Sequence, residues 1–456
     1  MDTKKLRQKI LDLAIHGKLV PQDSNDEPAS VLLERIRAEK ERLISEGKIK
    51  RSRKTVKTSD THHYEQDVPF EVPQGWVWTT LEEITSKIGS GSTPKGSNYS
   101  EEGIPFFRSQ NVYNEGLVYE DIKFISDAIH QLMIGTEVHS KDLLLNITGG
   151  SLGRCAIVPA DFQIGNVSQH VCIIRSILVL SSYVHTFILS PFFKKTMNIT
   201  GSGREGLPKY NLEKMFLPIP PLKEQERIIK EIEHWFTFID TIEQSKVNLQ
   251  TAIKQTKSKI LDLAIHGKLV PQDPSDEPAS ELLKRINPKA QITCDNEHYA
   301  QLPRGWSVCL LEDIIEYEQP TDYIVSSTNY DDSYLTPVLT AGKSFLIGYT
   351  DEEEGIYSKL PCIIFDDFTT ASKLVTFPFK VKSSAMKILQ VNQNISIKYV
   401  AAFMSITQLI GDTHKRYWIS EYSKLSILIP PKEEQERIVV AIDNLFNALD
   451  AVKENL

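Results

Sequence analysis

The side chains that could carry out catalysis do not assemble into a catalytic motif along this chain. Gly342-Lys343-Ser344 is similar to the end of a phosphate-binding loop, but the glycine required five positions earlier is Pro337. Asn287-Pro288-Lys289 departs from the Asn-Pro-Pro-aromatic signature of amino-methyltransferases, and the eleven histidines form no His-Glu-x-x-His pair. We therefore expect no catalytic site in the chain itself.

Metal binding is also disfavoured by the pattern of possible ligands. Asp366-Asp367 follows the apolar run Cys-Ile-Ile-Phe, which is more typical of the polar end of a strand than of a metal site. His16 and His266 precede Gly17 and Gly267, and this favours histidines that compensate the dipole at helix C-termini. The five cysteines are far apart and form no Cys-x-x-Cys pair, so neither disulfides nor structural zinc is expected.

Contacts to nucleic acid are the remaining chemistry that the residue types support. Loops rich in Gly, Ser and Thr at 89–97 and 201–206 allow close backbone approach to phosphates, and Arg, Lys, Asn and Gln can read base edges. The candidates in the first half are Lys95, Arg108, Gln110, Asn111, Arg204, Lys209 and Tyr210. Those in the second half are Lys343, Lys373, Lys382, Lys387, Lys415, Arg416, Tyr417 and Trp418. The alternative for each is a solvated surface side chain.

Charge limits how such contacts could work. The net charge of −8 argues against attraction of nucleic acid to the whole surface, although local basic patches remain compatible with it. Residues 297–426 carry 11 Lys and Arg against 16 Asp and Glu, so partner proteins would supply much of the electrostatic attraction. The run Lys-Ile-Lys-Arg-Ser-Arg-Lys-Thr-Val-Lys at 48–57 is either a solvated linker or a tail that contacts phosphates.

A long internal repeat indicates what positions these candidates. Residues 9–36 and 259–286 share 24 of 28 positions, and the spacing of 250 residues is far too wide for a solenoid. Pro-x-Gly-Trp recurs at 73–76 and 303–306, and Pro-Pro followed by Glu-Gln-Glu-Arg recurs near 220 and 430. Each half therefore holds the same conserved device around a long segment that is unlike its counterpart.

The conserved device is predicted to be helical. Apolar residues recur with a spacing of four and three from 228 to 263, and the seam needs a partner helix. Gly267 is the expected C-cap, and a short second helix should start in Asp-Glu-Pro-Ala-Ser at 276–280. The same seam stops at Leu456 and resumes near Thr3, with only the equivalents of 247–250 missing. A simple duplicated packing helix would explain the repeat, but we favour a pseudo-twofold molecule in which the two ends meet.

The fold class that follows is α+β, with two mixed domains separated by a long antiparallel two-helix coiled coil in a pseudo-twofold circular arrangement. The unlike segments 79–216 and 309–426 mix short β-rich runs with Gly, Ser and Asn turns, and no alignment between them can be defended beyond their edges. The chain of 456 residues is too long for one core, no apolar run spans a membrane, and nothing suggests secretion. A reducing cytoplasm fits the cysteine pattern.

This arrangement resembles the specificity subunit of type I restriction–modification enzymes, over essentially the whole chain. The resemblance rests on the doubled Gly-Lys-Leu-Val-Pro-Gln-Asp and Pro-Pro motifs, on 201–220, and on 89–112 and 340–357, which are similar to target-recognition motifs. It implies an N-terminal helical segment with a basic tail (1–60), a first target recognition domain (61–217), a helical spacer (218–296), a second recognition domain (297–426) and a C-terminal helix (427–456).

The resemblance also implies partners and cofactors. Each recognition domain would read half of an asymmetric bipartite site on double-stranded DNA, and the helices would dock two methyltransferase subunits, which the restriction and translocase subunits then join. The chain itself would be non-catalytic and bind no cofactor, since S-adenosylmethionine, ATP and Mg²⁺ belong to the partners. The segment 37–60 has no counterpart in the second half. The alternatives are a self-contained restriction or modification enzyme, a coiled-coil adaptor, and a DNA-binding protein outside restriction–modification.

Overall fold

The computed structural model describes residues 2–51, 68–197, 206–293, 302–340, 345–409 and 415–455. The chain divides into two compact units, Met1–Gln244 and Ser245–Leu456. The boundary falls inside the long helix α7 (Leu222–Ile265), which contributes its first half to the first unit and its second half to the second. Within the described part of the chain, no helix is both long and apolar enough to cross a membrane.

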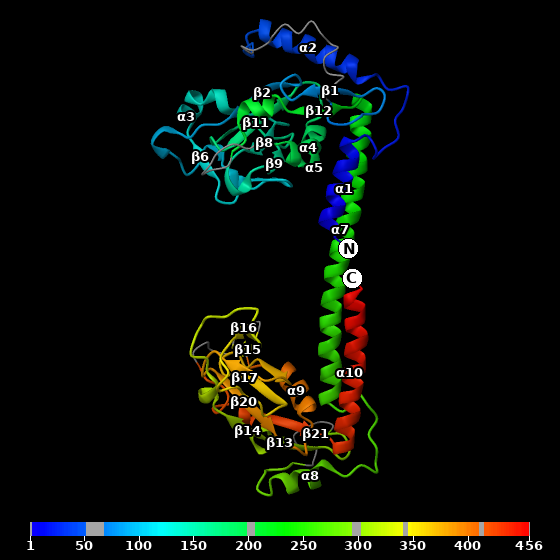
Figure 1. Ribbon diagram of the computed structural model, residues 1–456, viewed down its shortest axis with the longest axis vertical. Coiled ribbons are helices and arrows are strands. Elements are labelled where there is room, and N and C mark those ends of the chain that lie inside the picture. The colour runs from blue at the N-terminus through cyan, green and yellow to red at the C-terminus, as the bar shows by residue number, and fades with distance from the viewer. Residues whose placement is uncertain are drawn as a thin grey trace. The chain divides into compact units, whose positions relative to one another are not determined.

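The first unit combines many short strands with several helices (Figure 1). Its other helices are α1 (Thr3–Ile15), α2 (Ala29–Ser45), α3 (Asp127–Leu132), α4 (Ser181–Leu189), α5 (Pro191–Thr196) and α6 (Lys209–Glu213). Its strands are β1 (Val77–Thr80), β2 (Thr85–Ser90), β3 (Ile104–Phe107), β4 (Val112–Tyr113), β5 (Gly116–Leu117), β6 (Lys123–Ile125), β7 (Glu137–Val138), β8 (Leu143–Asn146), β9 (Cys155–Ile157), β10 (Gly165–Val167), β11 (Val171–Ser176) and β12 (Phe216–Ile219).

The second unit has the same kinds of element in the same general order. Its other helices are α8 (Ala279–Ile286), α9 (Ile397–Ile406) and α10 (Lys432–Glu454). Its strands are β13 (Ser307–Leu310), β14 (Ile315–Glu318), β15 (Thr336–Leu339), β16 (Leu346–Thr350), β17 (Cys362–Asp366), β18 (Ser372–Val375), β19 (Lys380–Val381), β20 (Met386–Val391) and β21 (Ser426–Ile429).

The two units share a sheet topology that the sequence comparison did not reveal. The main sheet of the first unit has the order β2-β11-β8-β9, and that of the second has the order β14-β20-β17-β18; every pair in both sheets is antiparallel. A second sheet in each unit contains one parallel pair, β3 with β10 and β15 with β19. The unlike segments are therefore two versions of one fold.

The central strands are covered on both faces, which explains why they are apolar throughout. In β8, Leu143 and Leu145 enter the core that includes the helices, while Leu144 enters a separate core beneath the second sheet. In β17, Ile363 and Phe365 enter the helical core, and Ile364 enters the opposite one. Alternation of polar and apolar residues is absent here because neither face of the strand meets water.

The conserved device pairs helices in the same way in each unit. In the first unit Arg7 of α1 bonds to Asp240 of α7, whereas Gln22, beyond the other end of α1, bonds to Glu224 at 3.1 Å. The pair is therefore antiparallel, and the two helices lie side by side in Figure 1. In the second unit Lys257 bonds to Asp450 at 2.7 Å and Gln272 to Glu434 at 3.1 Å, so the second half of α7 and α10 are also antiparallel. The prediction of antiparallel helix pairs is confirmed within each unit.

The predicted ends of these helices are also confirmed. Gly17 and Gly267 follow the helix ends with φ of +65° and +64°, a conformation that favours glycine. A Cβ at these positions would lie 2.3 Å from Cγ of Pro73 and 2.4 Å from Cγ of Pro303, so the turn also needs glycine for space. The proline that opens each Pro-x-Gly-Trp motif thus packs directly on the repeated helix end.

The histidines of the repeat have the structural role that their position predicts. Nδ1 of His16 lies 2.7 Å from the carbonyl oxygen of Asp12, and Nδ1 of His266 lies 2.7 Å from that of Asp262. Each imidazole therefore contacts a carbonyl of the last helical turn, and the carbonyl of Asp12 also accepts from the backbone amide of His16 at 3.1 Å. The short second helix of the repeat likewise begins at Ala279, as expected.

The helical seam is buried only in part. Ile228, Ile232, Ile253 and Ile260 are buried, as the 4–3 spacing predicts. Trp235 is nevertheless 37% exposed, and its ring stacks edge-on against Phe238, which is also exposed. The seam therefore contributes less apolar burial at this turn than its sequence pattern predicts.

Candidate nucleic-acid interface

Loops from several strands of the first unit meet at one end of its main sheet. We call this the first loop edge, and it comprises residues 91–95, 108–111, 147–154, 168–170 and 206–210. It lies where β2 and β8 end and where β9 and β11 begin, beside the ends of β3 and β10. Antiparallel neighbours bring these ends together, although the loops are up to about 120 residues apart in sequence.

Backbone hydrogen bonds tie the loops of the first loop edge to one another. The amide of Ser92 donates to the carbonyl of Val167 at 3.2 Å, and the amide of Ile147 donates to that of His170 at 3.0 Å. The amide of Leu207 donates to the carbonyl of Ile147 at 2.8 Å. A Cβ on Gly91 would lie 1.8 Å from the Val167 carbonyl oxygen, so only glycine allows the first loop to pack this closely.

The corresponding loops of the second unit form a second loop edge, comprising residues 319–323, 366–371, 382–385 and 415–418. The amide of Asp367 donates to the carbonyl of Ala385 at 3.0 Å, and the amide of Trp418 donates to Oδ1 of Asp367 at 2.8 Å. Nζ of Lys387 donates to Oε1 of Gln319 at 2.9 Å, which attaches the remaining loop. Asp367 is thus a hub that receives bonds from loops far apart in the sequence.

A buried ion pair stabilises this hub. Nζ of Lys387 lies 3.5 Å from Oδ2 of Asp367, and both side chains are almost fully buried. Such a pair is stable only when hydrogen bonds satisfy its remaining groups, which Gln319 and the Trp418 amide provide. The expectation that Asp366-Asp367 forms the polar end of a strand is confirmed, because β17 ends at Asp366.

Four of the residues predicted to contact DNA are instead part of the interior. Lys387 is 1% exposed because it pairs with Asp367, and Trp418 and Tyr417 are 1% and 4% exposed in the core of the second unit. Asn111 is fully buried, and its amide donates to the carbonyls of Val118 and Glu120 while accepting from the Arg108 amide. Their burial argues against direct contact with DNA in this structure, because composition does not distinguish an amide or cation that is satisfied internally from one at a surface.

The other candidates have several different environments. Lys95, Gln110, Lys209 and Tyr210 are exposed at the first loop edge, and Tyr210 is 55% exposed. Exposed candidates in the second unit are Lys373, Lys382, Lys415 and Arg416. Arg108 is half-buried and donates to the carbonyl of Asp121 at 2.8 Å. Arg204 and Lys343 lie outside the described residues, as does most of the basic run 48–57. Exposure makes contact possible, so the predictions for the eight exposed residues stay predictions.

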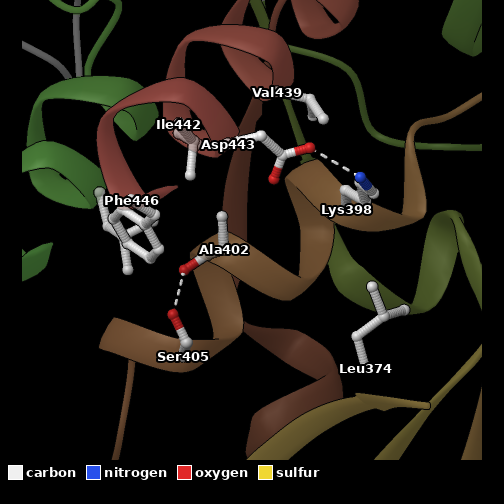
Figure 2. Close-up of a pocket in the computed structure, with 9 residues that line it drawn as sticks. Leu374, Lys398, Ala402, Ser405, Val439, Ile442, Asp443 and Phe446 are labelled. Atoms are coloured by element: carbon white, nitrogen blue, oxygen red, sulfur yellow. Dashed lines mark hydrogen bonds and ion pairs between the residues drawn. The ribbon is translucent and has the colours of Figure 1, made fainter. Parts of the chain in front are cut away.

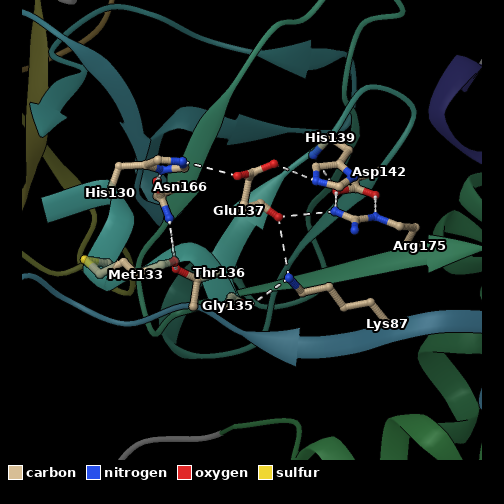
Figure 3. Close-up of polar contacts among 10 residues, drawn as sticks. All are labelled: Lys87, His130, Met133, Gly135, Thr136, Glu137, His139, Asp142, Asn166 and Arg175. Carbon is tan, nitrogen blue, oxygen red and sulfur yellow. Dashed lines mark hydrogen bonds and ion pairs between the residues drawn. The ribbon is translucent and has the colours of Figure 1, made fainter. Parts of the chain in front are cut away.

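A polar cluster holds β10, which leads into the first loop edge (Figure 3). Asn166 of β10 donates to the carbonyl of Met133 at 3.1 Å and accepts from Nδ1 of the buried His130 at 2.6 Å. The carboxylate of Glu137 lies between two imidazoles, 3.2 Å from Nε2 of His130 and 2.8 Å from Nε2 of His139. These bonds fix the strand two residues before Ser168, where the loop begins.

Lys87 and Arg175 complete this cluster on the side of the main sheet. Arg175 binds Asp142 through two bonds of 2.7 Å, and Lys87 donates to the carbonyl of Gly135 at 2.8 Å (Figure 3). Burial lowers the pKa of the Lys87 ammonium, with the neighbouring Arg175 charge acting in the same direction. Both cations are thus bonded to groups of their own unit.

A small pocket in the second unit is lined by none of the residues of the second loop edge (Figure 2). Its volume is about 210 Å³, and it is lined by apolar side chains of α9, α10 and the second half of α7, including Ala402, Ile442 and Phe446. Lys398 and Asp443 form an ion pair of 2.7 Å at the pocket. It lies where α9 packs against α10 and the second half of α7, and we assign it no role in nucleic-acid contact.

Comparison with known proteins identifies the family to which these units belong. A family model described as "Type I restriction modification DNA specificity domain" matches residues 73–253 and 303–456, one copy for each unit. The chain belongs to this family. The two matches cover the two recognition folds and the helices that follow them, so the family resemblance seen in the sequence is confirmed.

Curated relatives are similar over much of their length. The specificity subunit of the type I restriction enzyme EcoAI from Escherichia coli is 26% identical, with 99% of this chain and 90% of the relative aligned. The specificity subunit of the EcoEI enzyme from the same species is 30% identical, over 68% of this chain and 62% of the relative. The second relative is thus matched over somewhat less than two thirds of its length.

Solved structures share the fold. A chain from a study of complex assembly and conformational transition of the type I R-M system matches with a TM-score of 0.60 at 16% identity, covering 85% of this chain and 94% of that one. The HsdS subunit from Thermoanaerobacter tengcongensis matches with a TM-score of 0.50 at 16% identity, covering 85% and 93%. The predicted fold class of two sheet-rich domains with long helices is confirmed at this level.

The first loop edge also contains side chains that were not among the individual candidates named from the sequence. Thr93 and Gln169 are exposed, and their side chains bond to each other. Gln169 and Thr148 also bond to the two ring nitrogens of His170. The sequence signal for Gln169 and His170 was weak, because Asn-Val-Ser-Gln-His carries no basic residue beyond the histidine. Only the antiparallel pairing of β2, β11 and β8 places these residues beside the glycine-rich loop.

Proposed function

We propose that this chain is the DNA-recognition subunit of a type I restriction–modification complex and reads an asymmetric bipartite target. The observation that carries the proposal is that one sheet topology occurs twice with different side chains at its loop edges. The first loop edge presents Thr93, Gln110 and Gln169, whereas the second presents Lys415 and Arg416. Two readers with the same fold and different surface chemistry suit two different half-sites.

The proposed complex divides the work between this chain and its partners. The relatives are named specificity subunits, and we extend that role to this chain, which we propose to be non-catalytic. Two methyltransferase subunits would dock on the helix pairs, and restriction and translocase subunits would join that core. S-adenosylmethionine, ATP and Mg²⁺ would be bound by those partners. We propose that the complex acts in the cytoplasm, where it meets chromosomal and invading DNA.

The net charge of −8 supports a division of DNA binding between this chain and its partners. Lys87, Arg175 and Lys387 are engaged inside the units, and Lys415 is paired with Glu421. Because phosphate neutralisation dominates DNA affinity, we infer that a chain with this net charge gains much of its affinity from partners. We therefore expect weak DNA binding by the isolated chain and tight, salt-dependent binding by the assembled complex.

A domain exchange tests this function. The complete chain is co-expressed with the methyltransferase subunits of its own system, and methylated sites in the host genome are mapped by sequencing. Replacing residues 79–216 by those of a relative with another target should change one half-site and leave the other. A matched exchange of 309–426 should change only the second half-site. A symmetric target, or a change in both halves, would refute the two-reader proposal.

A further inference from the structure

A chain of hydrogen bonds crosses the first loop edge and ends on both sides in hydroxyl groups. The hydroxyl of Thr93 bonds to Oε1 of Gln169, and Nε2 of Gln169 lies 3.1 Å from Nε2 of His170. Nδ1 of His170 lies 2.8 Å from Oγ1 of Thr148. These hydrogen bonds therefore join the loop after β2 to the loop after β8 through the loop before β11.

This series of hydrogen bonds fixes the orientation of the Gln169 amide. When Nε2 of Gln169 donates to Nε2 of His170, the imidazole carries its proton on Nδ1 and donates it to Thr148. The amide oxygen then accepts from the Thr93 hydroxyl. An exposed glutamine ordinarily samples many rotamers, and immobilising it costs free energy on binding. Here the side chain is already immobilised in the folded unit, so binding a ligand requires little further loss of conformational entropy.

The bonded amide still has capacity for a ligand. A primary amide has two N–H donors and an oxygen with two lone pairs, and the contacts above use one of each. One donor and one acceptor remain on neighbouring atoms of an exposed side chain. This pair matches the major-groove edge of adenine, where N7 accepts and the N6 amino group donates. Guanine offers two acceptors at the same edge and does not match.

We infer that Gln169 is the residue with which the first unit reads an adenine in its half-site, and that Thr93 and His170 position it. This inference rests on the proposed function, which does not specify which residue reads which base. The backbone around the amide is suited to this role, since Gly91 allows the loop after β2 to pack directly on residues 167–168.

The test uses the full chain assembled with its methyltransferase subunits and measures binding to duplexes carrying each base at every target position. We expect Gln169→Ala to reduce discrimination for adenine at one position of one half-site by roughly 5- to 150-fold. Discrimination at all other positions should be retained. Thr93→Val, which removes the hydroxyl and nearly keeps the side-chain volume, should weaken discrimination at the same position by a smaller factor.

A matched variant and a stability measurement separate the outcomes. Gln163→Ala changes another exposed glutamine of the same unit, whose amide donates to the carbonyl of Asp161 at 3.0 Å, and should leave every position unchanged. Unaltered thermal unfolding of Gln169→Ala excludes a merely structural effect. If the wild-type complex reads two half-sites but Gln169→Ala relaxes none, or relaxes a position that is not adenine, the inference is refuted. If the wild-type complex reads no sequence at all, the proposed function fails first.

Discussion

Arg437 donates from Nη2 to Oδ2 of Asp276 at 2.6 Å, and Arg227 makes the same bond to Asp26 at the same distance in the other unit. The pair joins the start of the helix with the Glu-Gln-Glu-Arg motif to the loop after the repeated helix. In each unit a second bond, from Gln272 to Glu434 or from Gln22 to Glu224, lies beside it. The two motifs that the sequence repeats most faithfully are therefore the two sides of one contact.

The first prediction concerns this contact. Asp276→Asn should lower the free energy of unfolding of the second unit by roughly 1–2 kcal/mol, because a largely buried acceptor loses its charge while Arg437 stays half-exposed. Asp26→Asn is the matched variant and should have a similar effect on the first unit. Hydrogen exchange followed by mass spectrometry assigns each loss to a unit. Equal loosening of both units by either variant would contradict a local role for the contact.

The second prediction concerns pH and Glu434. Burial raises the pKa of the Glu434 carboxyl above its usual 4.5, although bonds from Gln272 and Trp306 act in the opposite direction. The folded unit then binds more protons than the unfolded chain just above pH 4.5, so this group makes the unit less stable as pH rises through that interval. Glu434→Gln should remove this slope. It should also lower the free energy of unfolding by about 1–3 kcal/mol at neutral pH. One carboxylate oxygen is replaced by an amide NH2 group, which would then face the N–H donor of Gln272 or of Trp306.

Urea unfolding of the wild-type and Glu434→Gln chains between pH 4 and 7 measures both effects. Glu224→Gln is the matched variant, since burial also raises the pKa of Glu224. If the free energy of unfolding of the wild-type chain and that of Glu434→Gln rose by the same amount across this pH interval, other carboxylates would dominate the pH dependence. Glu434 would then not control this part of the profile.

The helical device was predictable from the sequence because its determinants are local. Periodicity, a glycine at the helix end and prolines before the next helix each act within a few residues, and they recur at Gly17 and Gly267 with the same geometry. The repeat itself added a second, independent copy of every signal. Helix bounds, caps and antiparallel pairing within each unit therefore followed without coordinates.

The recognition folds were less predictable because their determinants are non-local. The common order β2-β11-β8-β9 and β14-β20-β17-β18 depends on pairing between strands up to about 90 residues apart, and the two segments cannot be aligned in sequence beyond their edges. The same limit applies to the site. Lys387 was chosen for its charge, but its burial depends on Asp367, which is distant in sequence. Gln169 was missed because only tertiary pairing reveals Thr93 and His170 beside it.

The third prediction concerns the length of the helices. We consider an insertion of seven residues in α7 between Lys246 and Leu249, together with seven more at the C-terminal end of α10. Each helix then grows by about 10 Å, and the gap between the half-sites should lengthen by a similar distance. The heptad register is retained, so both helix pairs should persist. The bases of each half-site should not change. Genome-wide mapping of methylated sites measures the gap, and an unchanged gap would show that the helices do not set it.

The last prediction concerns the two ends of the chain. The seam that stops at Leu456 resumes near Thr3, and four positions equivalent to 247–250 are missing between them. If the ends adjoin, a helix-forming insert of four residues should bridge them, since four residues advance about 6 Å. New ends can be opened after Lys50, an exposed residue beyond α2. We expect this circular permutant to fold, recruit its methyltransferase partners and direct methylation to the original target.

The physical reason is that the permutant keeps both antiparallel pairs and changes only connectivity. Arg7 would still meet Asp240, and Lys257 would still meet Asp450, because each of these contacts lies within one unit. A control with a four-residue Gly-Ser bridge closes the chain without helix and should fold with lower stability. If the helical bridge gave no advantage over Gly-Ser, the ends would not belong to one interrupted helix. Cooperative folding without recruitment of partners would instead mean that a free chain end forms part of the docking surface.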